Sequence, residues 1–201
     1  MPLKTNRISP VRLIPISFLL AILAGSILLW LPFSAAPGET TGFLTALFTA
    51  TTSVCVTGLV VVDTCAHWSS FGQLVILILI QIGGLGIITV ASMIMLLGKK
   101  KFYLGDHMLL GESLNVDMRK GLLPFLIHIF KGVLVVETIG AILYAVKFVP
   151  LLGWAGGLWA AVFQSVSAFC NAGMDVLGPN SMMDLRDSAL VMWLTMMLIL
   201  L

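Results

Sequence analysis

The chain has 201 residues, of which 59% are hydrophobic and only 10% are charged, and its mean hydropathy is +1.09. Soluble domains carry charge on about a quarter of their residues, so this composition excludes an ordinary soluble protein and indicates an integral membrane protein. The formal net charge of +2 does not point to nucleic acid as a partner; the lipid bilayer is the expected one.

Long and short apolar segments alternate along the chain. We expect membrane-spanning helices at 13–32, 71–97, 122–149 and 189–201, the last of them truncated, and short apolar helices at 43–54 and 158–169. A helix of 12 residues reaches only ~18 Å at ~1.5 Å per residue, whereas the hydrocarbon core is ~30 Å thick. Each short helix should therefore enter and return on one side, with its free backbone groups lining a protected cavity.

Basic residues predict the orientation in the membrane. Eight of the eleven lie in two segments, before the first span or after the second: Lys4, Arg7, Arg12, Lys99, Lys100, Lys101, Arg119 and Lys120. By the positive-inside rule, the N-terminus and the 98–120 connection should face the cytoplasm. The first apolar run is longer than a signal-peptide core, so we expect it to remain in the membrane.

Two similar stretches follow the two short helices: SVCVTGLVVVDT at 53–64 and SAFCNAGMDV at 167–176. At a fixed offset of 115 residues, Phe48 matches Phe163, Cys55 matches Cys170, Gly58 matches Gly173, and Thr52 falls on Ser167. The matches lie at equivalent places in two units of the same pattern, which indicates an internal repeat.

The first of these turns has the chemistry of a cation site. A helix capped at Thr40 or Thr41 and ending near Val54 would direct the negative end of its dipole toward Val56, Thr57 and Gly58. Glycine permits backbone angles that other residues avoid, so successive carbonyls could face one axis and replace the water around an ion.

Three segments carry a resemblance to a known family: SVCVTGLVVVDT, LIQIGGLGIIT (79–89) and SAFCNAGMDV. They are similar to the membrane subunit of Trk/Ktr/HKT-type potassium transporters, closest to the bacterial Ktr type. The resemblance implies an all-α multi-pass fold of membrane helix, re-entrant pore helix with filter loop, and membrane helix, repeated around a central pore. It further implies that backbone carbonyls bind potassium in two filter strands: Val56, Thr57 and Gly58 in the first, and Cys170, Asn171, Ala172 and Gly173 in the second.

The resemblance also implies the cellular setting. Glycine at Gly58 and Gly173 goes with potassium selectivity in this family, whose Ktr type is associated with sodium-dependent activity. A bacterial cell membrane, a homodimer of the complete protein and a cytoplasmic nucleotide-binding regulatory subunit are expected, with no organic cofactor in this chain. Met174 departs from the family, which usually has Phe there, and should alter packing behind the filter.

The expected organisation is a first unit at 1–97, a cytoplasmic connection at 98–120 and a second unit at 121–201. Only two of four units would be present, so the chain could also be a non-conducting fragment or a split-gene half that needs a partner chain or a second copy. An intramembrane enzyme is the remaining alternative, but no HExxH, GxSxG or intramembrane carboxylate pair supports it.

Several other residues carry weaker expectations. Asp63 and Asp175 either concentrate cations at the outer mouth or are ordinary loop carboxylates. Cys55 and Cys170 should fill space behind the filter, and Cys65 completes an odd set of three with no disulfide or metal-ligand spacing. Gly83, Gly84 and Gly86 should permit close helix packing or a bend.

Charged residues in the third span are costly there. We expect Lys131 and Glu137 to contact another helix, without assigning either a transport role, and Lys147 to reach the outer interface. The 98–120 connection is either an interfacial connector or a docking surface for a cytoplasmic regulator.

Overall fold

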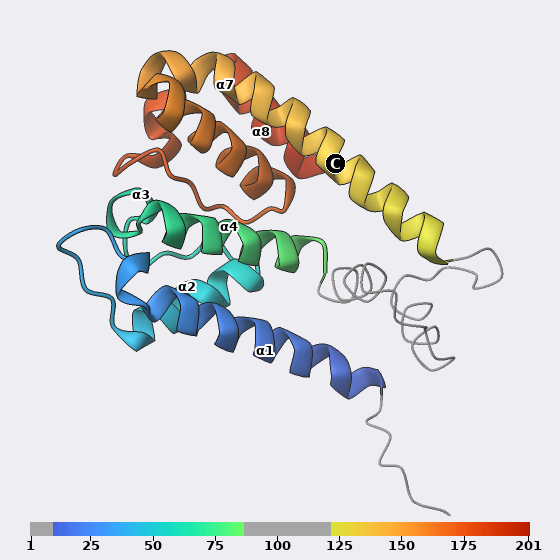
Figure 1. Cartoon of the computed structure of the whole chain (residues 1–201). Helices are drawn as coiled ribbons and strands as arrows, with labels where there is room; N and C mark the ends of the chain where they lie inside the picture. The colour runs from blue at the N-terminus through green and yellow to red at the C-terminus, as the bar shows by residue number, and fades with distance from the viewer. Residues whose placement is uncertain (1–9, 87–121) are drawn as a thin grey trace, which may run out of the picture.

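A computed structural model describes residues 10–86 and 122–201 of the protein, and within these ranges the chain is helical (Figure 1). The helices are α1 (Pro10–Trp30), η1 (Pro32–Ser34), α2 (Phe43–Val54), α3 (Thr64–His67), α4 (Ser70–Gly84), α7 (Leu122–Phe169), η3 (Ser181–Leu185) and α8 (Ala189–Leu200). Most of them run along one common axis. The predicted connection at 98–120, residues 87–97 of the second predicted span and most of the basic residues lie outside the described residues.

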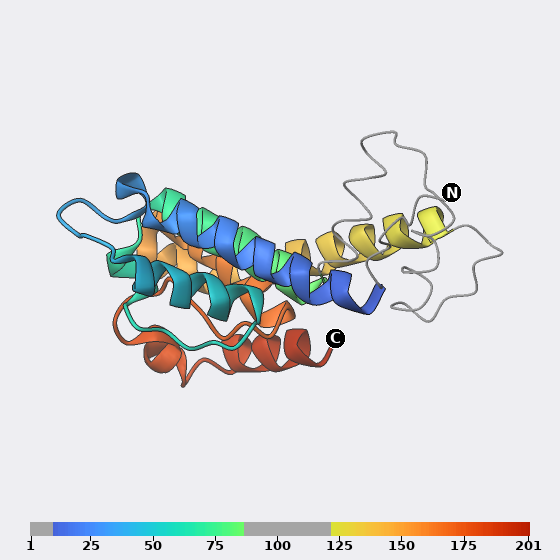
Figure 2. The same ribbon diagram turned by 90° about the horizontal axis from the view of Figure 1, so that it is seen from below.

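Helix α4 lies at the centre of the molecule, with α1 and α2 on one side and α7 and α8 on the other (Figures 1 and 2). Its buried face consists of apolar residues at helical spacing, among them Val75, Ile76, Leu79 and Ile80. Burial of such a stripe is what stabilises a helix against its neighbours. The helix was predicted to continue to residue 97; the structure ends it at Gly84, where Leu85 is the C-cap and Gly86 has a φ of 79°.

Helix α7 is two helical arms joined at a sharp bend. Gly153 has a φ of 77° and a ψ of 174°, which are not helical angles, and the second arm runs back beside the first (Figure 1). Gly157 permits this close return, because a Cβ atom there would lie 2.5 Å from the Cα of Val149. The sequence predicted a span ending at residue 149 and a short helix at 158–169, and the break between them is confirmed.

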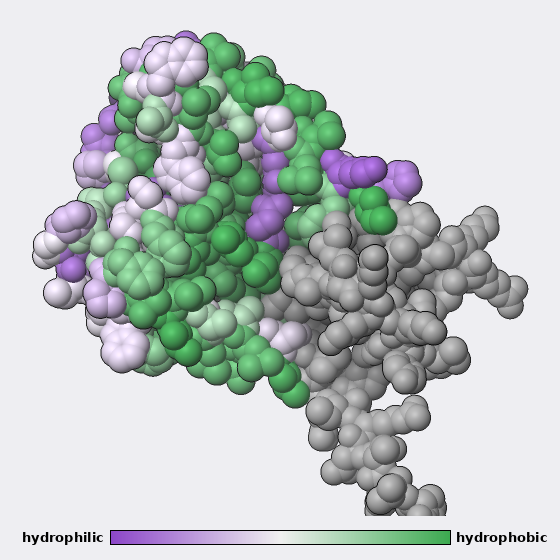
Figure 3. Space-filling model, viewed as in Figure 1, coloured by the Kyte–Doolittle hydropathy of each residue, from purple (hydrophilic) through white to green (hydrophobic). Residues whose placement is uncertain are grey.

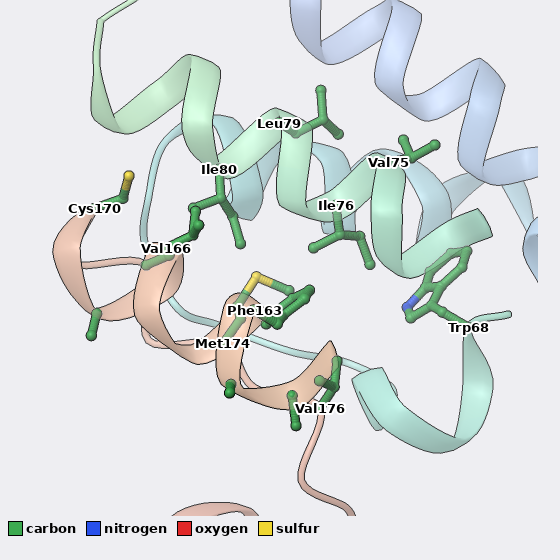
Figure 4. Packing of buried hydrophobic residues seen from close by; sticks show 14 of the residues in the cluster. Trp68, Val75, Ile76, Leu79, Ile80, Phe163, Val166, Cys170, Met174 and Val176 are labelled. Carbon is green, nitrogen blue, oxygen red and sulfur yellow. The ribbon is translucent and has the colours of Figure 1, made fainter. Parts of the chain in front are cut away.

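Residues near α3 join the two halves of the molecule. The Gln73 amide on α4 donates to the Trp68 carbonyl at 3.1 Å, and its oxygen accepts from the Trp159 indole nitrogen at 2.7 Å. Trp68 itself is buried in the core (Figure 4). One amide thus links the loop before α4 to the returning arm of α7.

The outer faces of the helices are largely apolar, while polar residues gather at the end that carries α3 and the loops, with a further group at the opposite end of the described chain (Figure 3). Exposed large side chains include Leu20, Ile27, Leu44, Ile142 and Trp193. Within the described residues one helix, Ile127–Phe169, is long and apolar enough to cross a membrane, and shorter apolar helices cover Pro15–Trp30, Phe43–Val54, Ser70–Gly84 and Ala189–Leu200. The positions of the predicted spans therefore agree with the helices, but their lengths agree only in part.

Candidate functional site

The first short helix, α2, covers Phe43–Val54, as the apolar segment predicted, but its N-cap differs from the predicted one. Its N-cap is Gly42, not Thr40 or Thr41, and no side chain caps it. The Thr41 hydroxyl instead bonds to the His67 imidazole at 2.9 Å. The predicted end at Val54 is correct.

The two turns that follow the short helices have the same backbone hydrogen bonds. After α2, the N–H groups of Cys55, Val56 and Thr57 donate to the carbonyls of Thr51, Ser53 and Thr52. After α7, the N–H groups of Cys170, Asn171 and Ala172 donate to the carbonyls of Val166, Ala168 and Ser167. Every donor and acceptor is displaced by 115 residues, so the repeat read from the sequence extends to the geometry of the turn.

The same backbone angles recur at the same positions. Val56 and Asn171 have φ values of 53° and 58°, and Gly58 and Gly173 have values of 76° and 64°. A positive φ is unusual for a β-branched residue and costs on the order of 1–3 kcal/mol. The structure therefore holds Val56 in a strained conformation that glycine alone would adopt freely.

We call residues 56–58 and 170–173, which follow the two short helices, the first and second strands, although neither is a β-strand. A hydroxyl group anchors the end of each. The Thr52 hydroxyl accepts from the Leu59 N–H at 3.0 Å, and the Ser167 hydroxyl accepts from the Met174 N–H at 3.1 Å. The sequence alignment of Thr52 with Ser167 signalled an equivalence, but not this role. The Leu59 N–H shares a peptide group with the Gly58 carbonyl, and the Met174 N–H shares one with the Gly173 carbonyl. In a trans peptide the carbonyl points away from the N–H. The Gly58 and Gly173 carbonyls therefore point away from the hydroxyls that hold these N–H groups.

The two strands meet at their glycines. A Cβ atom on Gly58 would lie 2.8 Å from the Ala172 carbonyl oxygen, and one on Gly173 would lie 3.5 Å from the Gly58 Cα. The structure thus brings Gly58 of the first strand beside Ala172 and Gly173 of the second, while Val56 and Cys170 lie against Gly83 and Gly84 at the end of α4. Thr57 and Asn171 are exposed, whereas Ala172 is fully buried.

Glycines at the end of α4 permit close contact with both turns. A Cβ atom on Gly83 would lie 2.2 Å from the Val54 carbonyl oxygen, and one on Gly84 would lie 2.4 Å from the Cys170 sulfur. The expectation of close packing at these glycines is confirmed. Cys170 is buried there, as predicted. Cys55 is exposed, so the prediction that it fills space behind the filter is wrong for the described part of the chain. No helix of that part packs against Cys55 as α4 packs against Cys170.

Met174 is buried between the end of α2 and the second strand. It is 2% exposed, and its sulfur accepts a weak hydrogen bond from the Ser53 hydroxyl on α2 at 3.7 Å. Its flexible thioether side chain suits such a gap between two turns.

The two loop carboxylates organise turns. Asp63 caps α3 by accepting from the Ala66 N–H at 2.7 Å, while Asp175 accepts from the Leu177 N–H at 3.1 Å and from the Ser181 hydroxyl. Burial raises the pKa of the Cys65 thiol, and the carboxylates of Asp63 and Asp175 raise it further. Both carboxylates therefore lie near enough to Cys65 to disfavour its thiolate, in addition to accepting the hydrogen bonds that shape their turns.

One charged residue of the third predicted span does reach another helix. Glu137 is 7% exposed and accepts from the Gln81 side-chain amide of α4 at 2.8 Å. Lys131 is exposed, so its expected interior contact is not found, and Lys147 is exposed as well. Sequence reasoning gave Gln81 no role, although a lone amide in the apolar run of α4 was a usable signal.

Comparison with known proteins gives a consistent result. Residues 14–201 match the family model described as TrkH, cation transport protein. The chain is 43% identical to the potassium/sodium uptake protein NtpJ of Enterococcus hirae over 96% of its length, and 38% identical to the Ktr system potassium uptake protein B of Bacillus subtilis over 98%. It spans 43% and 44% of the length of these relatives.

Proposed function

Because this chain belongs to the TrkH family of membrane cation transport proteins, we propose that it forms part of a potassium uptake pathway across the bacterial cell membrane. Relatives of this chain are transporters, not enzymes, so the intramembrane enzyme is set aside. Two of those relatives are named for potassium uptake, one of them together with sodium. The proposed transported ion is therefore K⁺, with Na⁺ as a possible second or coupling ion.

The proposed site consists of backbone carbonyls in the two strands, with Val56, Thr57 and Gly58 in one and Cys170, Asn171, Ala172 and Gly173 in the other. The observation that carries this proposal is the identical turn geometry, displaced by 115 residues, at the carbonyl ends of two short helices. In an ordinary extended strand, successive carbonyls point to opposite sides. Here every second residue has a positive φ, which rotates the peptides between them out of that pattern. Such a backbone can present several carbonyls to one ion, as potassium filters do.

The proposed organisation keeps the predicted boundaries: a membrane-pore-membrane unit at 1–97, a connection at 98–120 and a second unit at 121–201. The N-terminus and the connection would be cytoplasmic. The name of the Bacillus relative identifies it as protein B of a Ktr system, which supports the presence of a second component. In this proposal that component is a cytoplasmic nucleotide-binding regulator. A homodimer of the full-length protein completes the proposal.

The strand assignment can be tested by replacing Gly58 with serine. The test protein is a full-length chimera in which this chain replaces the matching part of NtpJ, expressed in cells that lack potassium uptake. A side chain at Gly58 would clash with the Ala172 carbonyl and oppose a φ of 76°. Gly58→Ser should lower the preference for K⁺ over Na⁺ by about tenfold, equivalent to ~1.4 kcal/mol of discrimination.

A matched control separates this effect from general backbone strain. Gly38 also has a positive φ, of 91°, but no atom lies within 4 Å of a Cβ atom placed there. Gly38→Ser should therefore keep the ion preference of the parent chimera. Flux measurements that show the same preference in Gly58→Ser and the parent would refute the strand assignment.

A further inference from the structure

A row of three polar side chains connects helix α7 to the second strand. The Gln81 amide nitrogen donates to the Glu137 carboxylate at 2.8 Å, and the Gln81 oxygen lies 3.8 Å from the Cys170 sulfur, within the range of a weak S–H hydrogen bond. Glu137 lies on the first arm of α7, Gln81 on α4, and Cys170 at the start of the second strand. We call these three residues the relay.

The relay determines which end of the Gln81 amide faces the strand. An amide has two donors on nitrogen and an acceptor oxygen, whereas a carboxylate only accepts. Glu137 therefore binds the nitrogen of Gln81, and the oxygen is left to accept the Cys170 thiol. With no acceptor at position 137, the amide could rotate and present its nitrogen to the thiol instead.

Cys170 transmits this orientation because it is tightly packed. Its sulfur and Cβ would lie 2.4 and 2.5 Å from a Cβ atom on Gly84, and its neighbour in sequence, Asn171, has the positive φ of the turn. Cys170 lies at the end of α4 beyond Ile80 and Val166 (Figure 4). A displaced thiol would thus move the backbone at the entrance of the second strand.

The first turn has no equivalent support in the described part of the chain. The residue 115 positions before Glu137 is Ile22, which carries no polar side chain, and Cys55 is exposed. A buried carboxylate is costly in an apolar setting unless it is paired, and here the cost falls at the second strand alone. This asymmetry indicates a role specific to that strand.

We propose that Glu137 is a positioning residue for ion discrimination, acting through Gln81 on the backbone that begins at Cys170. The inference rests on the proposed function, since it concerns the same strands. It assigns Glu137 the role of a hydrogen-bond acceptor and gives it no direct contact with the transported ion.

The test compares Glu137→Leu, Gln81→Leu and Glu137→Gln in the full-length chimera. Leucine has a similar size and removes the polar group, and a cavity of about 480 Å³ beside Gln81 and Glu137 gives it room. Glutamine keeps an oxygen that can accept from Gln81. The measurements are the half-saturating concentrations of K⁺ and Na⁺, the maximal uptake rates and the amount of transporter in the membrane.

We expect Glu137→Leu and Gln81→Leu each to change the K⁺ to Na⁺ ratio of half-saturating concentrations by about threefold to tenfold, the size expected for one lost hydrogen bond. Glu137→Gln should stay within about twofold of the parent. The double leucine variant should be no worse than either single one, because both remove the same connection. Thr138→Val is the matched control, since the Thr138 hydroxyl donates to the Leu134 carbonyl of its own helix and, among the described residues, bonds to neither Gln81 nor Glu137.

Two results would overturn the inference. If the leucine variants lower only the maximal rate or the amount of transporter, with the ion ratio unchanged, Glu137 serves stability alone. If Glu137→Gln loses discrimination as Glu137→Leu does, its charge matters and the acceptor role is wrong. The Gly58→Ser chimera separates these outcomes from a failure of the proposed function, because it tests the strands without touching the relay.

Discussion

At the scale of single residues, the two strands depend on hydroxyl groups as much as on glycine. Thr52 accepts from the Leu59 N–H and shares a 2.6 Å hydrogen bond with the Thr57 hydroxyl. Ser167 does the equivalent for Met174. These contacts hold a backbone that would otherwise relax, since Val56 has a strained φ of 53°.

Replacing Thr52 with valine should release the first strand. Valine has the same shape but no hydroxyl, so the partly buried hydrogen bond from the Leu59 N–H would be lost, at a cost of about 0.5–1.5 kcal/mol. Thr51→Val is the matched control, because the Thr51 hydroxyl bonds only to the Leu47 carbonyl of its own helix. We expect Thr52→Val to lower potassium uptake by the chimera severalfold at equal abundance in the membrane. Equal uptake by the Thr51 and Thr52 variants would contradict the anchoring role.

At the scale of elements, α4 is the support on which both turns rest. Gly83 contacts the end of α2, and Gly84 contacts the start of the second strand. Small residues at such positions allow helices and backbone to approach closely within a membrane. The same helix carries Gln73 and Gln81, which bond to Trp159 and Glu137 of α7, so α4 is joined to α7 near both of its ends.

Gly83→Ala should destabilise the transporter even though alanine favours helices. The new methyl group would lie 2.2 Å from the Val54 carbonyl oxygen, and overpacking of this kind costs about 1–3 kcal/mol. Gly132→Ala is the control, because no atom of the described residues lies within 4 Å of a Cβ atom at that position. Thermal unfolding of the purified chimera should show a lower midpoint for Gly83→Ala and an unchanged or higher one for Gly132→Ala. A midpoint for Gly83→Ala equal to that of the parent would mean that α4 does not pack closely on α2.

The sequence predicted the elements better than their contacts, for physical reasons that individual residues make clear. Segment lengths and the repeat located both turns, because each depends on local pattern and on glycine. The cap was predicted at Thr40 or Thr41, but the Thr41 hydroxyl bonds to His67, a partner 26 positions away that a local pattern does not reveal. The bond between Gln81 and Glu137 was missed for the same reason, since no local pattern relates residues 56 positions apart.

At the scale of the whole molecule, the surface and the strands point to different partners. The outer faces of the helices are largely apolar (Figure 3), as expected for contact with lipid. By contrast, Thr57, Asn171 and Gly173 of the strands are exposed, and at Gly173, which has no side chain, the exposed surface is backbone. Backbone groups of this kind need water, an ion or further protein within a membrane.

Two strands side by side do not surround an ion, because a filter replaces the hydration shell from all sides with a ring of carbonyls. We therefore predict that this chain expressed alone will not restore growth of potassium-uptake-deficient cells in low potassium, whereas the full-length chimera will. The chimera carrying Gly58→Ser reports whether rescue depends on the proposed strands, and detection of the chain in the membrane excludes a simple failure of insertion. Rescue by the chain alone would contradict the need for further units in the same polypeptide, and it would show that separate copies can supply the missing strands.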